Sequence, residues 1–203
     1  PNVDGFEFLD RLKEESQTPV IVVSSQSRAA AVMEALDRGA TDFIAKIGAF
    51  HEGEPSVFFR ESVLEKCRVA VGIWGNRSSF EEVGRQLPID GTEDDSNGDN
   101  ITKVICVGAS TGGPGALREL FVDQQLQNDT VILVAQHMPG GFTSALAERL
   151  SACSEFEVRE AVAGERIRGG KVYIAPGDFH LRLIKQGNCH YVELVKARGN
   201  DLC

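Results

Sequence analysis

An acidic segment at residues 90–100 divides the chain into two parts. It reads DGTEDDSNGDN, with five carboxylates, no basic residue and no apolar side chain. Such a composition cannot bury enough apolar surface to offset the entropy that ordering it would cost. Apolar residues recur periodically before the segment, and a fresh apolar strand follows it at residues 104–107. We therefore expect a flexible linker between two folded modules rather than a surface loop of one domain.

Composition narrows the class of protein. The 203 residues are 42% hydrophobic and 25% charged, an ordinary balance for a soluble globular chain with a sizeable core. No apolar run approaches the roughly 18 residues of a membrane span, and residues 1–5 lack the basic start and apolar stretch of a signal peptide. The sequence therefore predicts a cytoplasmic protein without membrane insertion.

Charge and cysteine usage exclude two further kinds of partner. The formal net charge of −9, without any Lys/Arg-rich run, lacks the positive patch that phosphate-backbone binding requires, so no nucleic acid is expected. The five cysteines are widely spaced and form no C-x-x-C pair, which favours stray or buried thiols over a disulfide framework or a thiolate zinc site.

The first module has the pattern of a parallel α/β unit. Asp4 can cap a helix with an apolar face, and Glu7 three places later completes a capping pattern. Two buried strands are predicted at residues 20–23 and 42–45, with a helix over residues 27–38 between them. The result is a βαβ unit.

Polar side chains follow both of these strands. Ser24 and Ser25 stand at the carboxyl end of the first, and Lys46 at that of the second. Because open α/β sheets bind ligands at this edge, the group suits an anion such as a phosphoryl group. Spacing alone favours the plainer interpretation of two loop serines and a solvated lysine, because βαβ units with a terminal lysine are common.

The second module begins with a strand, a G-x-S-x-G turn and a helix. Residues 103–120 read KVICVGASTGGPGALREL, with Ser110 in the turn and Pro114 near the start of the helix. This is the context of a nucleophile elbow, whose sharp turn exposes the serine Oγ and is expected to leave no room for large flanking side chains. Backbone N–H groups near Thr111 and Gly112, at the positive end of the helix, can stabilise an oxyanion.

The glycines of this turn also fit two other interpretations, a phosphate cradle of a nucleotide-binding protein and a tight turn in a doubly wound sheet. A P-loop requires G-x-x-x-x-G-K-[ST], but no lysine follows Gly113. The spacing of these glycines also does not match the G-x-G-x-x-G of a dinucleotide-binding fold. Nucleotide binding is therefore the minor alternative.

A histidine is predicted to lie beside the serine. His137 follows a strand at residues 130–135, and a right-handed helical crossover would make this strand parallel and adjacent to the one before Ser110. A serine hydroxyl needs such an imidazole because it is too weakly acidic to attack a carbonyl unaided. A histidine that merely ends a strand is the commoner case in general. Weaker candidates, none of them after a buried strand beside the turn, are His51, His180 and His190, the last two in a predicted hairpin around Gly187.

Three runs of the first module resemble the second half of a response-regulator receiver domain. They are DGFEFL at residues 4–9, PVIVVSS at 19–25 and GATDFIAK at 39–46. The resemblance implies that Ser24 and Lys46 contact a phosphoryl group carried by an aspartate, and that residues 54–71 form the last helix of the receiver.

The phosphoacceptor aspartate of that family lies just before the position of Pro1, so we expect the chain to begin too late to contain it. Ile47 also replaces the proline that usually follows the lysine. A receiver without its first strands should not be switched by phosphate, and Mg2+ is expected only for an intact receiver.

Four runs of the second module resemble the catalytic domain of the chemotaxis protein-glutamate methylesterases. They are GASTGGP at residues 108–114, QHMPGGFT at 136–143, AERL at 147–150 and VYIAPGDFHL at 172–181. The resemblance implies hydrolysis of glutamate methyl esters on methyl-accepting chemoreceptors, and deamidation of certain glutamines, with Ser110 as nucleophile and His137 as general base. No metal or organic cofactor is implied for the esterase. The histidine kinase of the chemotaxis system is the implied partner of a complete receiver.

The order of the parts matches that family. We expect a partial receiver domain at residues 1–72, a flexible linker at 73–100 and a methylesterase catalytic domain at 101–203. The predicted fold class is α/β, with a partial receiver-type parallel unit followed by a doubly wound parallel sheet that lacks its C-terminal part.

In the family a downstream aspartate orients the histidine, and this chain is expected to end before it. Neither Asp178 nor Asp201 is predicted to take its place. An exposed sheet edge and an incomplete core are expected in the second module. The activity of the chain is expected to be weak or absent. Two classes of function stay open: a serine esterase, and a non-catalytic fragment that at most binds the receptor or a partner.

Overall fold

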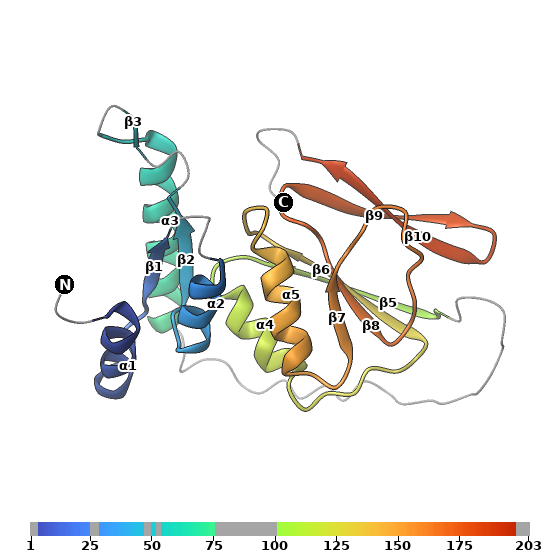
Figure 1. Ribbon diagram of the computed structural model, residues 1–203, viewed down its shortest axis with the longest axis horizontal. Coiled ribbons are helices and arrows are strands. Elements are labelled where there is room, and N and C mark those ends of the chain that lie inside the picture. Colours follow the sequence, from blue (N-terminus) through green and yellow to red (C-terminus); the bar gives the residue numbers. More distant parts are fainter. Residues whose placement is uncertain (1–3, 25–28, 47–49, 52–53, 76–100, 198–203) are drawn as a thin grey trace.

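The computed structural model describes residues 4–24, 29–46, 50–51, 54–75 and 101–197 (Figure 1). The elements of the first module are α1 (Gly5–Glu15), β1 (Ile21–Ser24), α2 (Ala29–Asp37), β2 (Asp42–Ala45), β3 (Phe50–His51), β4 (Glu54–Pro55) and α3 (Val57–Gly75). Those of the second are β5 (Lys103–Ala109), α4 (Gly113–Phe121), β6 (Thr130–Gln136), α5 (Thr143–Ala152), β7 (Glu157–Glu160), β8 (Lys171–Ile174), β9 (Phe179–Gln186) and β10 (Cys189–Lys196).

The predicted βαβ unit is present in the first module. Strands β1 and β2 pair in parallel, with Ile21 opposite Asp42 and Ser24 opposite Ala45. Helix α2 crosses between them and is followed by Gly39 at φ +95°, a left-handed conformation that glycine adopts without steric cost. The apolar runs therefore predicted both strands and their relative direction.

Two details of the first module differ from the prediction. Asp4 does precede α1, but its side chain makes no capping hydrogen bond, and Glu7 instead pairs with Arg11 one turn along the exposed face at 2.5 Å. The last helix begins after Pro55 in β4, where the Oγ of Ser56 accepts a hydrogen bond from the N–H of Phe59 at 3.2 Å. A serine cap thus sets the helix start three residues later than the resemblance to a receiver domain implied.

The second module is built on a four-stranded sheet in the order β5-β6-β8-β7, in which every neighbouring pair is parallel. Helices α4 and α5 pack on one face through buried side chains that include Leu117, Leu146 and Leu150. The antiparallel β9–β10 hairpin covers the other face, where Val192 packs with Val131 and Tyr173. The α/β class with a parallel sheet is confirmed.

Strand β5 lies at the edge of this sheet. Its side chains alternate between exposed and half-buried, and Val104 is 50% exposed, whereas β6 beside it is mostly buried. Among the described strands, β5 is thus an end strand of the sheet, and it leads into Ser110. That an edge is exposed because further strands are missing stays a prediction.

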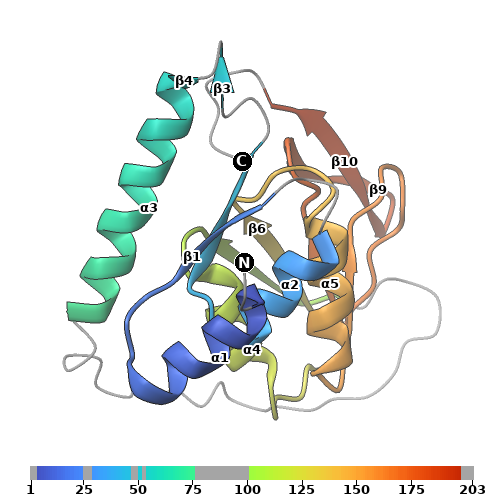
Figure 2. The ribbon, with the colours of Figure 1, turned by 60° about the vertical axis from the view of Figure 1, so that its left-hand side comes forward.

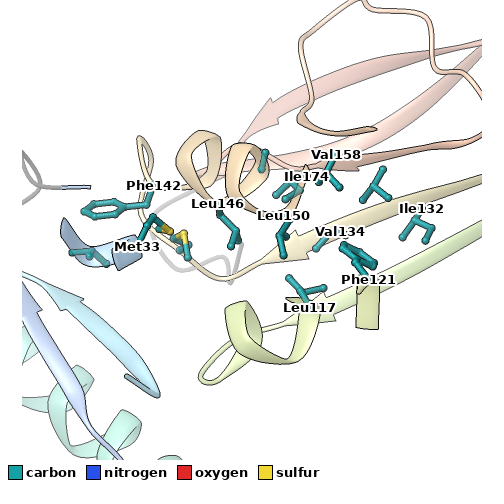
Figure 3. Close-up of a cluster of buried hydrophobic side chains, with 14 of the residues drawn as sticks. Met33, Leu117, Phe121, Ile132, Val134, Phe142, Leu146, Leu150, Val158 and Ile174 are labelled. Carbon is teal, nitrogen blue, oxygen red and sulfur yellow. The ribbon is translucent and has the colours of Figure 1, made fainter. Parts of the chain in front are cut away.

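The two modules share one hydrophobic core. Met33 of α2 and Phe43 of β2 are buried in the same cluster as Phe142 and Leu146 at the start of α5 (Figure 3). The rings of Phe43 and Phe142 lie 4.7 Å apart, centroid to centroid. Both views of the ribbon place α2 against the layer formed by α4 and α5 (Figures 1 and 2). The first module is thereby packed on the helical side of the parallel sheet.

The predicted domain limits stay a prediction. Helix α3 continues to Gly75, and the rest of the predicted linker lies outside the described residues. Cysteines 67, 106, 153 and 189 are free thiols, and Cys203 lies outside the described part of the chain.

Candidate active site

Ser110 and His137 come together at the carboxyl edge of the parallel sheet. The ladder between β5 and β6 ends with Ala109 opposite Gln136, and the N–H of His137 donates to the carbonyl of Ala109 at 2.8 Å. One residue further along each strand, Ser110 Oγ lies 3.4 Å from His137 Nδ1, and both residues are exposed. This is a long hydrogen bond, within the range from which catalytic pairs tighten when substrate binds. The predicted proximity is present.

The turn around Ser110 is set by two glycines that follow it. Gly112 has φ +78° and precedes α4, and the N–H of Gly113 donates to the carbonyl of Ser110 at 2.8 Å. A Cβ on Gly113 would lie 2.0 Å from Gln136 Oε1, so a side chain there would require the amide of Gln136 to move. At Gly108, by contrast, a Cβ would meet nothing within 4 Å. The expected lack of room is therefore wrong at Gly108, on the edge strand, whereas a close approach is present at Gly113, the residue that follows the motif.

The turn between Ser110 and α4 presents unpaired backbone donors. Within the described part of the chain, no acceptor takes the N–H of Thr111 or of Gly112. Both groups lie at the amino end of α4, where the helix dipole favours negative charge. They are in the region where an oxyanion formed by attack of Ser110 would need donors.

Gln136 belongs to this site, although the sequence was not interpreted that way. Its side chain is buried, and Nε2 donates to the carbonyl of Ser110 at 3.0 Å and to that of His137 at 3.2 Å. The available signal was a polar residue in the buried phase of an otherwise apolar strand, directly before the candidate base.

A second group that the sequence did not reveal holds the loop after His137. Thr143, fully buried at the start of α5, accepts a hydrogen bond from the N–H of Gly177 at 3.1 Å and donates to the carboxylate of Glu160. The backbone of Gly177 approaches that of Gly140 so closely that a Cβ would lie 2.5 Å from the nitrogen of Gly140. The loops after β6 and β8 are thus fixed against each other beside the site.

None of the described carboxylates contacts the ring of His137. Asp178 adopts φ +70°, its carbonyl accepts a hydrogen bond from Ala197, and its carboxylate lies beside Gly140. Asp201 lies outside the described residues. Of the weaker histidine candidates, His51 lies in β3, and His180 and His190 lie in the β9–β10 hairpin.

The sequence of each module matches the model of a known family. Residues 105–200 match the CheB methylesterase family, and residues 1–53 match the response regulator receiver domain. The second module is similar in sequence to this methylesterase family. The chain thus joins a receiver-type module to a methylesterase-family module, in the order predicted.

Curated relatives extend the similarity over nearly the whole chain. "Protein-glutamate methylesterase/protein-glutamine glutaminase" of Chromohalobacter salexigens is 38% identical over 97% of this chain and 54% of its own length. The protein of the same name from Thermotoga maritima is 40% identical over 97% of this chain and 56% of its own length. The chain therefore spans about half the length of these relatives.

A solved structure is also similar. The crystal structure of the Thermotoga maritima CheB methylesterase catalytic domain is 44% identical, over 49% of this chain and 52% of that one, with a TM-score of 0.45.

The receiver-type module brings its two predicted phosphoryl contacts to one sheet edge. Ser24 ends β1, and the N–H of Lys46, directly after β2, donates to the carbonyl of Ser24 at 2.7 Å. The side chain of Lys46 is exposed. Ser25 and Ile47 lie outside the described residues, and the phosphoryl-binding role of this pair stays a prediction.

The described residues do not fit a receiver-type Mg2+ site. Across the part of the chain that the structure covers, no three histidine, cysteine or acidic side chains gather where they could hold a metal ion.

The described helices also include none with the length and apolar character needed to cross a bilayer.

Proposed function

We propose that this chain carries the nucleophile and the base of a protein-glutamate methylesterase that also deamidates glutamine. The observation that supports this most is the 3.4 Å separation between Ser110 Oγ and His137 Nδ1 at the start of α4, within a methylesterase-family module. Both groups are exposed to substrate at the edge of the sheet.

The chemistry follows from these groups. Ser110 Oγ attacks the ester carbonyl carbon while His137 takes the hydroxyl proton, and the N–H groups of Thr111 and Gly112 stabilise the oxyanion. Collapse of the tetrahedral intermediate breaks the ester C–O bond, and methanol leaves with the proton from His137. Water, deprotonated by His137, then hydrolyses the acyl-serine to release the glutamate carboxylate. A glutamine side chain would lose ammonia by the same steps.

The substrate class comes from the relatives, whose names describe methylesterase and glutaminase activity on protein glutamate and glutamine. We propose methyl-accepting chemoreceptors as substrates and the cytoplasm as the compartment. The reaction uses no metal or organic cofactor, since proton transfer and backbone donors are sufficient for ester hydrolysis. In a complete receiver, Ser24 and Lys46 would contact the phosphoryl group transferred from a histidine kinase.

Methanol release from methylated chemoreceptor tests the proposal. The parent chain is compared with Ser110→Ala, His137→Gln and the control Ser62→Ala, which alters a helical serine of α3. We expect Ser110→Ala and His137→Gln each to lower the rate by roughly 10³-fold or more, because a nucleophile and its base act as one unit. The control should match the parent.

Equal methanol release by the parent and Ser110→Ala would refute the esterase. Co-sedimentation of the chain with receptor would then test the remaining possibility, a fragment that binds without catalysis.

A further inference from the structure

The side-chain amide of Gln136 donates hydrogen bonds to the backbone carbonyls of both residues of the proposed catalytic pair, Ser110 and His137. Nε2 donates one hydrogen bond to the carbonyl of Ser110 at 3.0 Å and a second to the carbonyl of His137 at 3.2 Å. These carbonyls belong to the residues whose side chains meet 3.4 Å apart. The bridge lies at the end of the β5–β6 ladder, next to the last backbone hydrogen bond between the strands, which the N–H of His137 donates to the carbonyl of Ala109 at 2.8 Å.

The other end of the amide indicates why glutamine stands here. Oε1 is buried, and no donor among the described residues reaches it. It lies against the backbone of Gly113, because a Cβ built there would come within 2.0 Å of it. Rotating the amide by half a turn would place Oε1 against two carbonyl oxygens, which repel it. The amide therefore keeps its two donated bonds at the cost of an unsatisfied acceptor.

A side chain chosen only to fill this space would be apolar, because a leucine or methionine leaves no buried acceptor unsatisfied. Only 3% of Gln136 is exposed, so the amide is shielded from the solvent that would otherwise satisfy Oε1. The two hydrogen bonds to the carbonyls of Ser110 and His137 are thus what glutamine supplies here and an apolar side chain cannot.

We propose that Gln136 is a positioning residue, which holds the carbonyls of Ser110 and His137 so that Oγ and Nδ1 stay within reach of each other. The inference rests on the proposed function, since the distance matters only if the pair exchanges a proton. Gln136 acts through these two residues and does not itself touch the reacting atoms.

The test compares Gln136→Met and Gln136→Glu with the parent. Methionine keeps the length of the side chain without a donor, and glutamate keeps its shape with no donor when ionised and a single one when protonated, so neither can donate to both carbonyls. Gln125→Met is the matched control, because Gln125 is exposed and its amide donates to Glu155 at 3.4 Å, away from the site. The first measurement is phosphonylation of Ser110 by a fluorophosphonate, resolved into the binding constant and the maximal rate.

We expect the maximal rate to fall roughly 10- to 100-fold in both Gln136 variants, because a misplacement of about 1 Å can cost that much, with the binding constant unchanged. A residue with a merely structural role would change the unfolding transition and leave the rate of the folded fraction unaltered. An unchanged maximal rate in both variants, with a reactive parent, overturns the inference.

The second measurement needs no activity. The ring nitrogen signals of His137 report its contact with Ser110, and Ser110→Ala gives the signals of the broken contact. We expect Gln136→Met to move the signals towards that value and Gln125→Met to leave them in place. If the parent is not phosphonylated but Gln136→Met moves the signals, positioning stands and the proposed function fails. Signals that stay at the parent value overturn positioning.

Discussion

Replacing Gly113 by alanine tests whether the turn after the nucleophile is as tight as the structure indicates. The added Cβ would lie 2.0 Å from Gln136 Oε1, 2.9 Å from Gln136 Cδ and 3.0 Å from the Cβ of Ala109. The φ of Gly113 is not positive, so the cost comes from contact and not from backbone strain. Gly115, two residues on in the same helix, is the matched control because a Cβ there would meet nothing within 4 Å.

The two substitutions should change the free energy of unfolding in opposite directions. Gly115→Ala should stabilise the protein by roughly 0.5–1 kcal/mol through helix propensity. Gly113→Ala should cost about 1–3 kcal/mol in overpacking, plus roughly 0.5–1.5 kcal/mol for each Gln136 hydrogen bond that breaks as the amide is pushed away. We therefore expect the two variants to differ by roughly 2–5.5 kcal/mol if one of these hydrogen bonds breaks, and by roughly 2.5–7 kcal/mol if both do.

Urea unfolding of both variants, followed by circular dichroism, measures this difference, and the rate of phosphonylation of Ser110 shows whether displacing Gln136 also affects the site. We expect a lower urea midpoint and slower phosphonylation of Ser110 in Gly113→Ala, and neither change in Gly115→Ala. Two variants of equal stability would show that the backbone at Gly113 has room for a side chain, and would refute the close approach on which the estimate depends.

Three further perturbations have defined outcomes. Lys66→Met should cost about 3–5 kcal/mol in urea unfolding, because it leaves the buried carboxylate of Asp42 without its 2.6 Å partner, and adding Asp42→Asn should recover most of the loss. Phe142→Ala should cost about 3–5 kcal/mol, and a loss below about 1 kcal/mol would contradict its full burial. Hydrogen bonds from Thr102, and then Thr130, lower the pKa of Asp129, so Thr102→Val should raise this pKa in an NMR titration. Because the pKa of Asp129 is lower in the folded state than in the unfolded state, its ionised carboxylate stabilises the fold at pH values above the unfolded-state pKa. This stabilisation is lost as the pH falls through the folded-state pKa. The Thr102→Val variant, in which the two pKa values differ less, should therefore lose less stability in acid than the parent.

The parts of the fold that the sequence predicted are those in which local pattern and tertiary structure agree. Apolar runs located β1, β2, β5 and β6, and the strand–turn–helix pattern placed Ser110 one residue past the end of a strand. Parallel pairing then brought His137 beside it, because both strands end at the same edge.

Other features depend on contacts that leave no spacing in the sequence. The sequence predicted the helix that contains Met33, but its pattern does not say that Phe142 of the other module will cover this side chain. The β3–β4 hairpin has two residues in each strand, which is too short for periodicity to show. Glu7 fits a capping pattern, yet Arg11 one turn later offers it a competing charge.

Gln136 is the clearest case in the site itself. A side-chain amide that bonds to backbone carbonyls can do so beside any residue type, so no motif in the sequence marks its partners. Only the burial of a polar side chain at the end of an apolar strand pointed to it.

The common core of the two modules has a consequence for dissecting this protein. Neither half can present Met33, Phe43, Phe142 and Leu146 to water without exposing much of what the other half covers. Severing the backbone of the folded protein between Gly75 and Ile101 should therefore yield two pieces that stay associated. Expressed separately, each piece should aggregate, so genetic dissection of this chain is better done by point substitution than by deletion.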